Sequence, residues 1–213
     1  MLGWIRWGSE RRIKLYTGRL CGLSVLTAQL PENARRPERA VDKAARMLRK
    51  NRVLRVLTPP DFSWWPLLAR AGLCPVDTAR LRCALAPAWV EAQLERRGVP
   101  PERAVLRLTG TEREPALNGL ARALCPLARG LTFDLPGGEE AANRLRREMG
   151  IPVLPAGSAQ AHLTLHLRDG PVLTGAEPAL PGRVLPADCD RLPLLSVLWE
   201  TGRIKTEEIV LKI

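Results

Sequence analysis

The stretch from residue 103 to residue 156 reads RAVLRLTG (103–110), TEREPALNGLARALCPLA (111–128), RGLTFDLPG (129–137), GEEAANRLRREMG (138–150) and IPVLPA (151–156). Its three apolar runs predict strands, and the two segments between them have the 3.6-residue period of amphipathic helices. Strands that alternate with helices form parallel sheets, which are usually covered by helices on both faces. The stretch therefore predicts a β-α-β-α-β unit, with its third strand at residues 152–154.

The fold class that follows is α/β, with a Rossmann-like three-layer (αβα) arrangement around a mainly parallel central sheet. Residues 53–57 (VLRVL) are expected to add another parallel strand beside the central three. Antiparallel hairpins are predicted at both ends of the chain. The first pairs residues 4–7 with 12–16 across a GSER turn, and residues 23–30 form a further strand. The second pairs the alternating run 161–167 with residues 171–174 across an Arg-Asp-Gly turn.

A chain of 213 residues can form two small lobes or one continuous domain, and the sequence leaves both open. The proline-containing segment 99–102 is the candidate boundary. It would separate a basic α/β lobe (residues 1–98: hairpin, strand, basic helix, strand and further helices) from a Rossmann-like lobe. The second lobe, residues 99–213, would hold the β-α-β-α-β unit, the second hairpin, a helix and a final strand.

Parallel sheets bind their ligands beyond the carboxyl ends of the strands. The sequence therefore predicts a small anionic or nucleotide-like ligand held there. The candidate residues are Thr109, Gly110, Asp134, Gly137, Gly138 and, if its loop faces the same crevice, Asp61. The glycine fingerprint of dinucleotide sites is incomplete, because TEREP follows Gly110 without a second or third glycine. An ordinary loop is thus the alternative, and no cofactor is identified.

The net charge of +11 is concentrated near the N-terminus. Residues 1–60 hold 14 Lys and Arg against 4 Asp and Glu, whereas the remaining residues hold 19 against 18. A helix predicted over residues 37–50 has a row of cations opposite an apolar stripe. This region is expected to bind nucleic acid or an acidic protein partner. The alternative is that the row of cations is an outer helix face that contacts only water. The candidate contacts are Arg11, Arg12, Lys14, Arg36, Arg39, Lys43, Arg46 and Lys50.

No P-loop, nucleophile elbow or H-E-x-x-H motif occurs, so no catalytic residue is assigned and a binding protein is favoured over an enzyme. The five cysteines form no C-x-x-C pair. His162 and His166 would lie about 13 Å apart on a strand, which is too far for one metal ion. No apolar run reaches the ~20 residues of a membrane span. The charged N-terminus lacks a secretory leader pattern, so the expected location is cytoplasmic.

Overall fold

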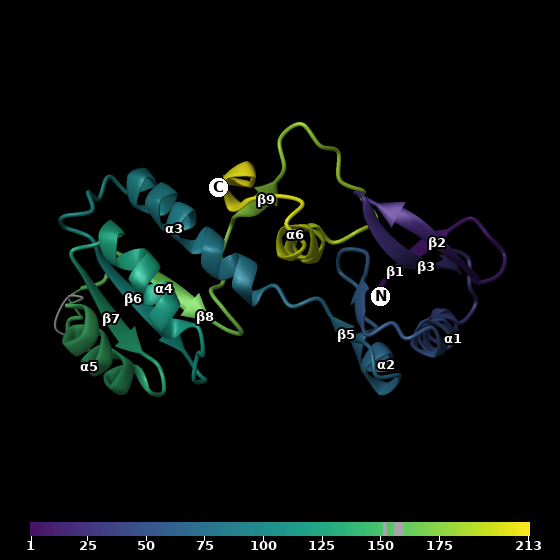
Figure 1. Ribbon diagram of the computed structural model, residues 1–213, viewed down its shortest axis with the longest axis horizontal. Helices are drawn as coiled ribbons and strands as arrows, with labels where there is room; N and C mark the ends of the chain where they lie inside the picture. Colours follow the sequence, from purple (N-terminus) through teal and green to yellow (C-terminus); the bar gives the residue numbers. More distant parts are fainter. Residues whose placement is uncertain (151–152, 156–159) are drawn as a thin grey trace. The chain divides into compact units, whose positions relative to one another are not determined.

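The computed structural model describes residues 1–150, 153–155 and 160–213, and the chain forms two compact units (Figure 1). The first comprises Met1–Asp77 and Leu180–Ile209, and the second comprises Thr78–Ala179 and Val210–Ile213. The expected division between residues 98 and 99 falls inside the second unit, because helix α3 (Ala79–Arg96) packs on the sheet that follows it. No helix in the described part of the chain has the length and apolarity needed to cross a bilayer.

The first unit is built on a mixed sheet whose strand order is β2-β3-β1-β4-β5. Strands β1 and β3 run parallel, as do β1 and β4, and β4 and β5, whereas β2 is antiparallel to β3. The bounds are β1 (Leu2–Gly8), β2 (Lys14–Leu20), β3 (Leu23–Pro31), β4 (Arg55–Leu57) and β5 (Cys74–Pro75). The strand predicted over residues 53–57 was expected beside the central three. That expectation is wrong, because β4 pairs with β1 in this sheet.

The hairpin predicted between residues 4–7 and 12–16 is also wrong. Strand β3 lies between β1 and β2, and the hairpin that forms is β2–β3, in which Leu20 pairs with Leu23. The two residues of its turn, Cys21 and Gly22, have φ angles of 49° and 82°. A two-residue type I′ turn requires positive φ at both positions, so both residues have the backbone that a tight β2–β3 connection needs.

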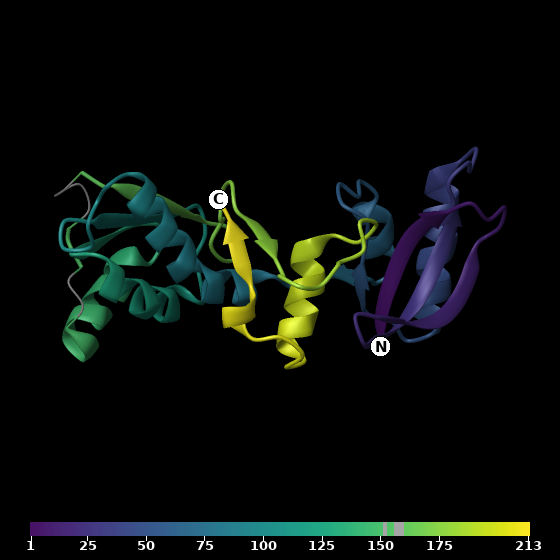
Figure 2. The same ribbon diagram turned by 90° about the horizontal axis from the view of Figure 1, so that it is seen from above.

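Helices lie on both sides of this sheet. Helix α1 (Pro37–Lys50) has the predicted bounds and buries the apolar side predicted for it, Val41, Ala44, Ala45 and Leu48. Helix α2 (Trp65–Arg70) lies beside α1. Helix α6 (Arg191–Glu200), contributed by the later segment, lies on the opposite side of the sheet (Figure 2). Ile5 of β1 belongs to the apolar cluster that α1 forms with the sheet, whereas its neighbour Trp4 does not and is 7% exposed on the other side of the strand.

The second unit contains the predicted β-α-β-α sequence in a fully parallel sheet of order β7-β6-β8. Val153 makes a parallel bridge to Leu131, which places the predicted third strand beside β7; Pro152 lies outside the described residues. The bounds are β6 (Val105–Gly110), α4 (Leu117–Leu124), a 3-10 turn η1 (Cys125–Leu127), β7 (Gly130–Asp134), α5 (Gly138–Met149) and β8 (Leu163–Leu167).

The prediction of a second hairpin is wrong, because β8 pairs in parallel with β6. The return segment makes only an isolated bridge between Leu167 and Pro171. Proline has no backbone N–H to donate, so it cannot extend a ladder. The antiparallel pair of this unit is instead β9 (Glu177–Ala179) with β10 (Val210–Lys212), the predicted final strand. A further 3-10 turn, η2 (Thr206–Glu208), precedes β10.

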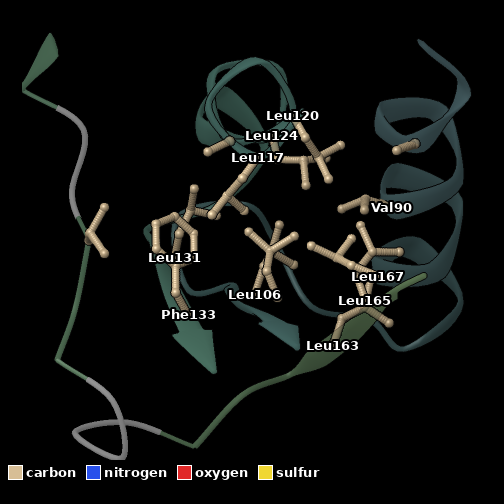
Figure 3. Packing of buried hydrophobic residues seen from close by; sticks show 14 of the residues in the cluster. Val90, Leu106, Leu117, Leu120, Leu124, Leu131, Phe133, Leu163, Leu165 and Leu167 are labelled. Carbon is tan, nitrogen blue, oxygen red and sulfur yellow. The ribbon is translucent and has the colours of Figure 1, made fainter. Parts of the chain in front are cut away.

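Helices α3, α4 and α5 contribute to one apolar cluster with alternate residues of the parallel strands. Figure 3 shows this packing, with α4 and Val90 of α3 facing the leucines of the sheet. Because side chains alternate along a strand, the opposite face carries the intervening residues. These are mainly polar: Arg107, Thr109, Thr132, Asp134, Thr164 and His166. Helices of the described chain thus cover one face of this sheet, and the expected cover on both faces is not seen there.

Candidate functional sites

The strand ends of the second unit place an acid, a hydroxyl and an imidazole in one row. Thr109 on β6 is in register with Asp134 on β7 and with His166 on β8. Neighbouring strands lie about 4.8 Å apart, so the backbones of Asp134 and His166 are separated by about 10 Å. Thr109 is half-buried, and the other two residues are exposed. We call these three residues the strand-end row.

His166 was missed as a site residue because the sequence assigned its strand to an antiparallel hairpin. Only the parallel pairing with β6 brings it beside Thr109. Gly110, the next residue, lies against β8. A Cβ on Gly110 would be 3.0 Å from the carbonyl oxygen of Leu167. The backbone of this turn is therefore in contact with protein, in contrast to the open turn that a pyrophosphate requires.

A pocket of about 270 Å³ lies between the starts of α4 and α5. Of the predicted ligand residues, Gly137 lines it, while Thr109, Gly110, Asp134 and Gly138 lie outside its wall. Gly137 has a φ of 78° and precedes α5. A Cβ there would be 3.0 Å from Nε of Arg113, so glycine allows this arginine to lie against the backbone.

The charges of this pocket are largely neutralised by one another. Glu140 pairs with Arg113 at 2.5 Å and with Arg144 at 3.3 Å. Glu114 accepts hydrogen bonds from the backbone N–H groups of Gly170, at 2.8 Å, and Ala116, at 3.2 Å. An anion entering the pocket would have to compete with Glu140 for both arginines, so the pocket has little spare positive charge to offer.

Asp61 belongs to the first unit and follows β4, whereas Asp134 belongs to the second unit. The two acids thus follow strands of different sheets. Asp61 is exposed, and its φ is 55°. Its charge acts on Asp190 within the first unit. Burial, and to a smaller extent the charge of Asp61, raises the pKa of Asp190 above its usual range, against the hydrogen bond from the Leu192 N–H that lowers it.

Cys189 is buried next to this acid. Its pKa is raised to about 12, first by burial and then by the charges of Asp190 and Asp188. A thiol becomes a nucleophile when positive surroundings lower its pKa, and the environment of Cys189 is the opposite. Among the described residues, no group of three His, Cys, Asp or Glu side chains is placed to hold a metal ion.

The first unit carries most of the excess positive charge. It holds 19 Lys and Arg against 11 Asp and Glu, whereas the second unit holds 14 against 11. Five exposed cations follow one side of α1, opposite its buried face. We call them the cationic ridge: Arg36, Arg39, Lys43, Arg46 and Lys50. Arg46 is paired with Asp42, and in the described part of the chain the other four have no ion pair.

A hollow of about 410 Å³ lies where β1 and β3 end and the chain enters α1. Residues 8–11 and 31–36 line it, and the Glu32 N–H donates to the Gly8 carbonyl at 3.0 Å to join the two segments. Three exposed arginines line this arginine hollow: Arg11, Arg35 and Arg36. Arg36 also begins the cationic ridge, so the hollow and the ridge form one continuous basic surface.

The remaining predicted basic residues lie close by in the sequence but differ in their surroundings. Arg12 and Lys14 are exposed, and Lys14 pairs with Glu10 at 2.6 Å. The sequence did not single out Arg35. Only the parallel pairing of β1 with β3 places residues 8–11 beside residues 31–36, and that pairing was not predicted.

The protein is thus a mixed α/β protein of two units, and exposed basic residues gather where β1 and β3 of the first unit end. Comparison with models of known protein families and with curated protein sequences finds no match.

Proposed function

We propose that the protein binds nucleic acid through the first unit, with the cationic ridge and the arginine hollow as its contact surface. One observation carries the proposal. Most of the ridge cations and all three arginines of the hollow are exposed and have no ion pair in the described part of the chain. Their charges are thus available to an external polyanion, whereas the arginines of the second unit's pocket are held by Glu140.

The spacing of the ridge supports a phosphate polymer as the ligand. A helix rises 1.5 Å per residue, so steps of three or four residues separate the cations by about 4.5–6 Å along α1. A nucleic-acid strand places a phosphate about every 3.4 Å of duplex axis, and more widely when it is extended. The ridge spans about 21 Å by the same helix rise. Arginine, which makes up three of its five members, binds phosphate oxygens bidentately.

Binding to fluorescein-labelled 20-mers of single-stranded DNA, duplex DNA and RNA tests this proposal. Because binding releases counterions, log Kd should depend linearly on log salt, with a slope of about 3.5 for single strands and about 4.5 for duplex DNA if about five phosphates are neutralised. Lys43→Gln combined with Lys50→Gln should lower the slope by about 1–2. Arg96→Gln combined with Arg147→Gln, which alters exposed arginines of the second unit, is the matched control and should leave the slope unchanged.

Two outcomes would overturn nucleic-acid binding. One is the absence of low-salt affinity for every oligonucleotide. The other is equal weakening by the ridge variant and the control variant, which would indicate a general effect of net charge. If an acidic protein is the true partner, the basic surface should capture it equally well before and after nuclease treatment, and the oligonucleotide titrations should be flat.

A second candidate function rests on the strand order of the second unit. With Val153 beside β7, the order of the four paired segments matches the 3-2-1-4 part of a Rossmann sheet, in which ligands bind at the switch between strands 1 and 4. Here that switch lies between β6 and β8, where Thr109 and His166 are in register. We propose a small anionic or nucleotide-like ligand at this edge, held by the side chains of the strand-end row instead of the closed turn at Gly110 and bound without chemical conversion.

Nucleotides and phosphorylated metabolites should then raise the melting temperature of the protein, and Asp134→Ala should reduce the shift. A screen in which no compound raises it, together with a silent Asp134→Ala variant, would reject this second function. The five cysteines, all of which lie in the described part of the chain, form no disulfide. This supports a reducing compartment such as the cytoplasm as the place where the protein binds either ligand.

A further inference from the structure

We propose that the arginine hollow recognises a terminal phosphate of the bound nucleic-acid strand. This inference rests on the proposed function and assigns a role to one part of its surface. The cationic ridge begins at Arg36, and the other two arginines, Arg11 and Arg35, surround the hollow beyond it. A strand that follows α1 toward its first residue therefore reaches a pocket at that point, and the line of ridge cations ends there.

The size of the hollow suits a ligand group that enters it. Pockets for small molecules measure roughly 300–1,000 Å³, and the hollow, at about 410 Å³, falls in this range. Two pockets of the second unit, at about 270 and 280 Å³, lie just below it. A single terminal nucleotide with its phosphate is small enough to enter a hollow of this size. An internal stretch of the strand, which continues on both sides, would lie across the surface instead.

The hollow also has the chemistry for a phosphate monoester. Guanidinium groups donate pairs of hydrogen bonds to phosphate oxygens. Ser9 and Asn33, which also line the hollow, carry a hydroxyl and an amide that can donate. A phosphate monoester carries about 1.5–2 negative charges near neutral pH, compared with one for an internal diester. Two or three arginines gathered in one place therefore distinguish the end of a strand from its interior.

Two acids, Glu10 and Glu32, line the same hollow, and a carboxylate there repels a phosphate. Glu10 is bound by Lys14 at 2.6 Å, so its charge is compensated. Glu32 is exposed and has no ion pair in the part of the chain described. The lining thus has three positive charges against one uncompensated negative charge. Removing Glu32 should therefore strengthen binding of a terminal phosphate, while removing the arginines should weaken it, and these opposite signs provide a test.

The experiment compares one 12-mer DNA strand in three forms: with a 5′-phosphate, with a 3′-phosphate, and with hydroxyls at both ends. The fluorophore is attached to an internal base, and binding is measured by anisotropy at fixed salt. We expect one phosphorylated form to bind about tenfold more tightly than the unphosphorylated strand, as one added charge-assisted hydrogen bond would produce. Arg11→Gln combined with Arg35→Gln should abolish this preference, and Glu32→Gln should increase it.

Arg19→Gln combined with Arg70→Gln is the control for the same loss of charge in the first unit, and it should retain the preference. Inorganic phosphate and a mononucleotide, added as competitors, show whether the hollow takes a free phosphate as well as a strand end. A preference that they abolish at low concentration would assign the hollow to small phosphates and overturn end recognition. Thermal melting of each variant checks that the exposed substitutions leave the fold intact.

The remaining outcomes distinguish recognition of strand ends from nucleic-acid binding in general. Equal binding of all three strands would overturn end recognition and leave nucleic-acid binding intact. A preference that survives in the Arg11 and Arg35 double variant would place the terminal phosphate elsewhere and overturn the inference. No binding of any strand would overturn both.

Discussion

Glu114 and Gly170 are joined by a 2.8 Å hydrogen bond from the backbone N–H of Gly170 to the carboxylate of Glu114, across 56 residues of sequence. The bond connects the segment after β6 to the turn after β8. Arg82 of α3 donates to the carbonyls of three residues in the same turn, Arg168, Asp169 and Pro171. Side chains from two other elements thus satisfy the turn's backbone groups.

We expect Glu114→Ala to destabilise the second unit by about 1–2 kcal/mol, because it removes a charge-assisted bond and leaves a backbone donor unpaired. Glu114→Gln should cost less, since the amide oxygen can still accept. Gly170→Ala should cost more, because the φ of Gly170 is 97° and a Cβ would lie 2.9 Å from Cα of Ala79. Urea unfolding followed by circular dichroism measures the loss of unfolding free energy for each of the three variants. A larger loss for Glu114→Gln than for Gly170→Ala would contradict this account of the turn.

Asp190 should make the first unit less stable as pH rises. Burial raises its pKa in the folded protein, so the folded state binds the proton more tightly than the unfolded state does. The free energy of unfolding then falls as pH rises from the unfolded pKa through the folded one. Asp190→Asn keeps an oxygen for the Leu192 N–H bond and removes the ionisation. This variant should gain stability relative to wild type between pH 4 and pH 7.

Denaturant titrations of both proteins at pH 4 and pH 7 measure that difference. Asp190→Ala provides the comparison, because it also removes the helix cap, a loss of about 1 kcal/mol. If the Asn and Ala variants lose the same stability at pH 7, the burial of the carboxylate is not the dominant effect.

The thiols should differ widely in reactivity. With a pKa of about 12, Cys189 is a thiolate in about one molecule in ten thousand at pH 8, and it is buried besides. Cys74 is exposed. Ellman's reagent should therefore label Cys74 within the first phase and reach Cys189 only after denaturant is added. A Cys74→Ser variant assigns the fast phase, and rapid labelling of Cys189 in the native protein would contradict the buried position.

Leu106→Ala should destabilise the second unit by about 2–5 kcal/mol, because Leu106 is 1% exposed at the centre of the cluster in Figure 3. Leu54→Ala is the control. Leu54 is 52% exposed, and its truncation should change the free energy of unfolding by less than about 0.5 kcal/mol. Similar losses for the two variants would argue against the described packing.

Local features of the sequence were sufficient to predict the helices and several strands. The period of Val41, Ala44 and Leu48, with proline at the first position, determines α1. The same reasoning gave β6, α4, β7 and α5. These predictions succeed because amphipathic periodicity is encoded within one element.

Pairing between strands could not be predicted in the same way, because it depends on contacts far apart in the chain. The type I′ turn that forms the first hairpin uses Cys21, a residue type rarely found at positive φ, so it gave no recognisable signal. Asp169 and Gly170 gave a strong hairpin signal, yet Pro171 cannot continue the ladder. Because the pairings of β8 with β6 and of β1 with β3 were not predicted, the sequence did not place His166 in the strand-end row or Arg35 in the arginine hollow.

The chain order of the first unit has a consequence for biosynthesis. Its sheet is complete by residue 77, but α6, which lies over the Trp4 side, is encoded after the whole body of the second unit. At about 5–20 residues per second, a ribosome needs roughly 5–20 s to make the intervening hundred residues. During this interval the side of the nascent sheet that carries Trp4 is open to water, so we expect the ion partners of Arg6 and Arg55, namely Asp188 and Glu200, to arrive only when the late segment emerges.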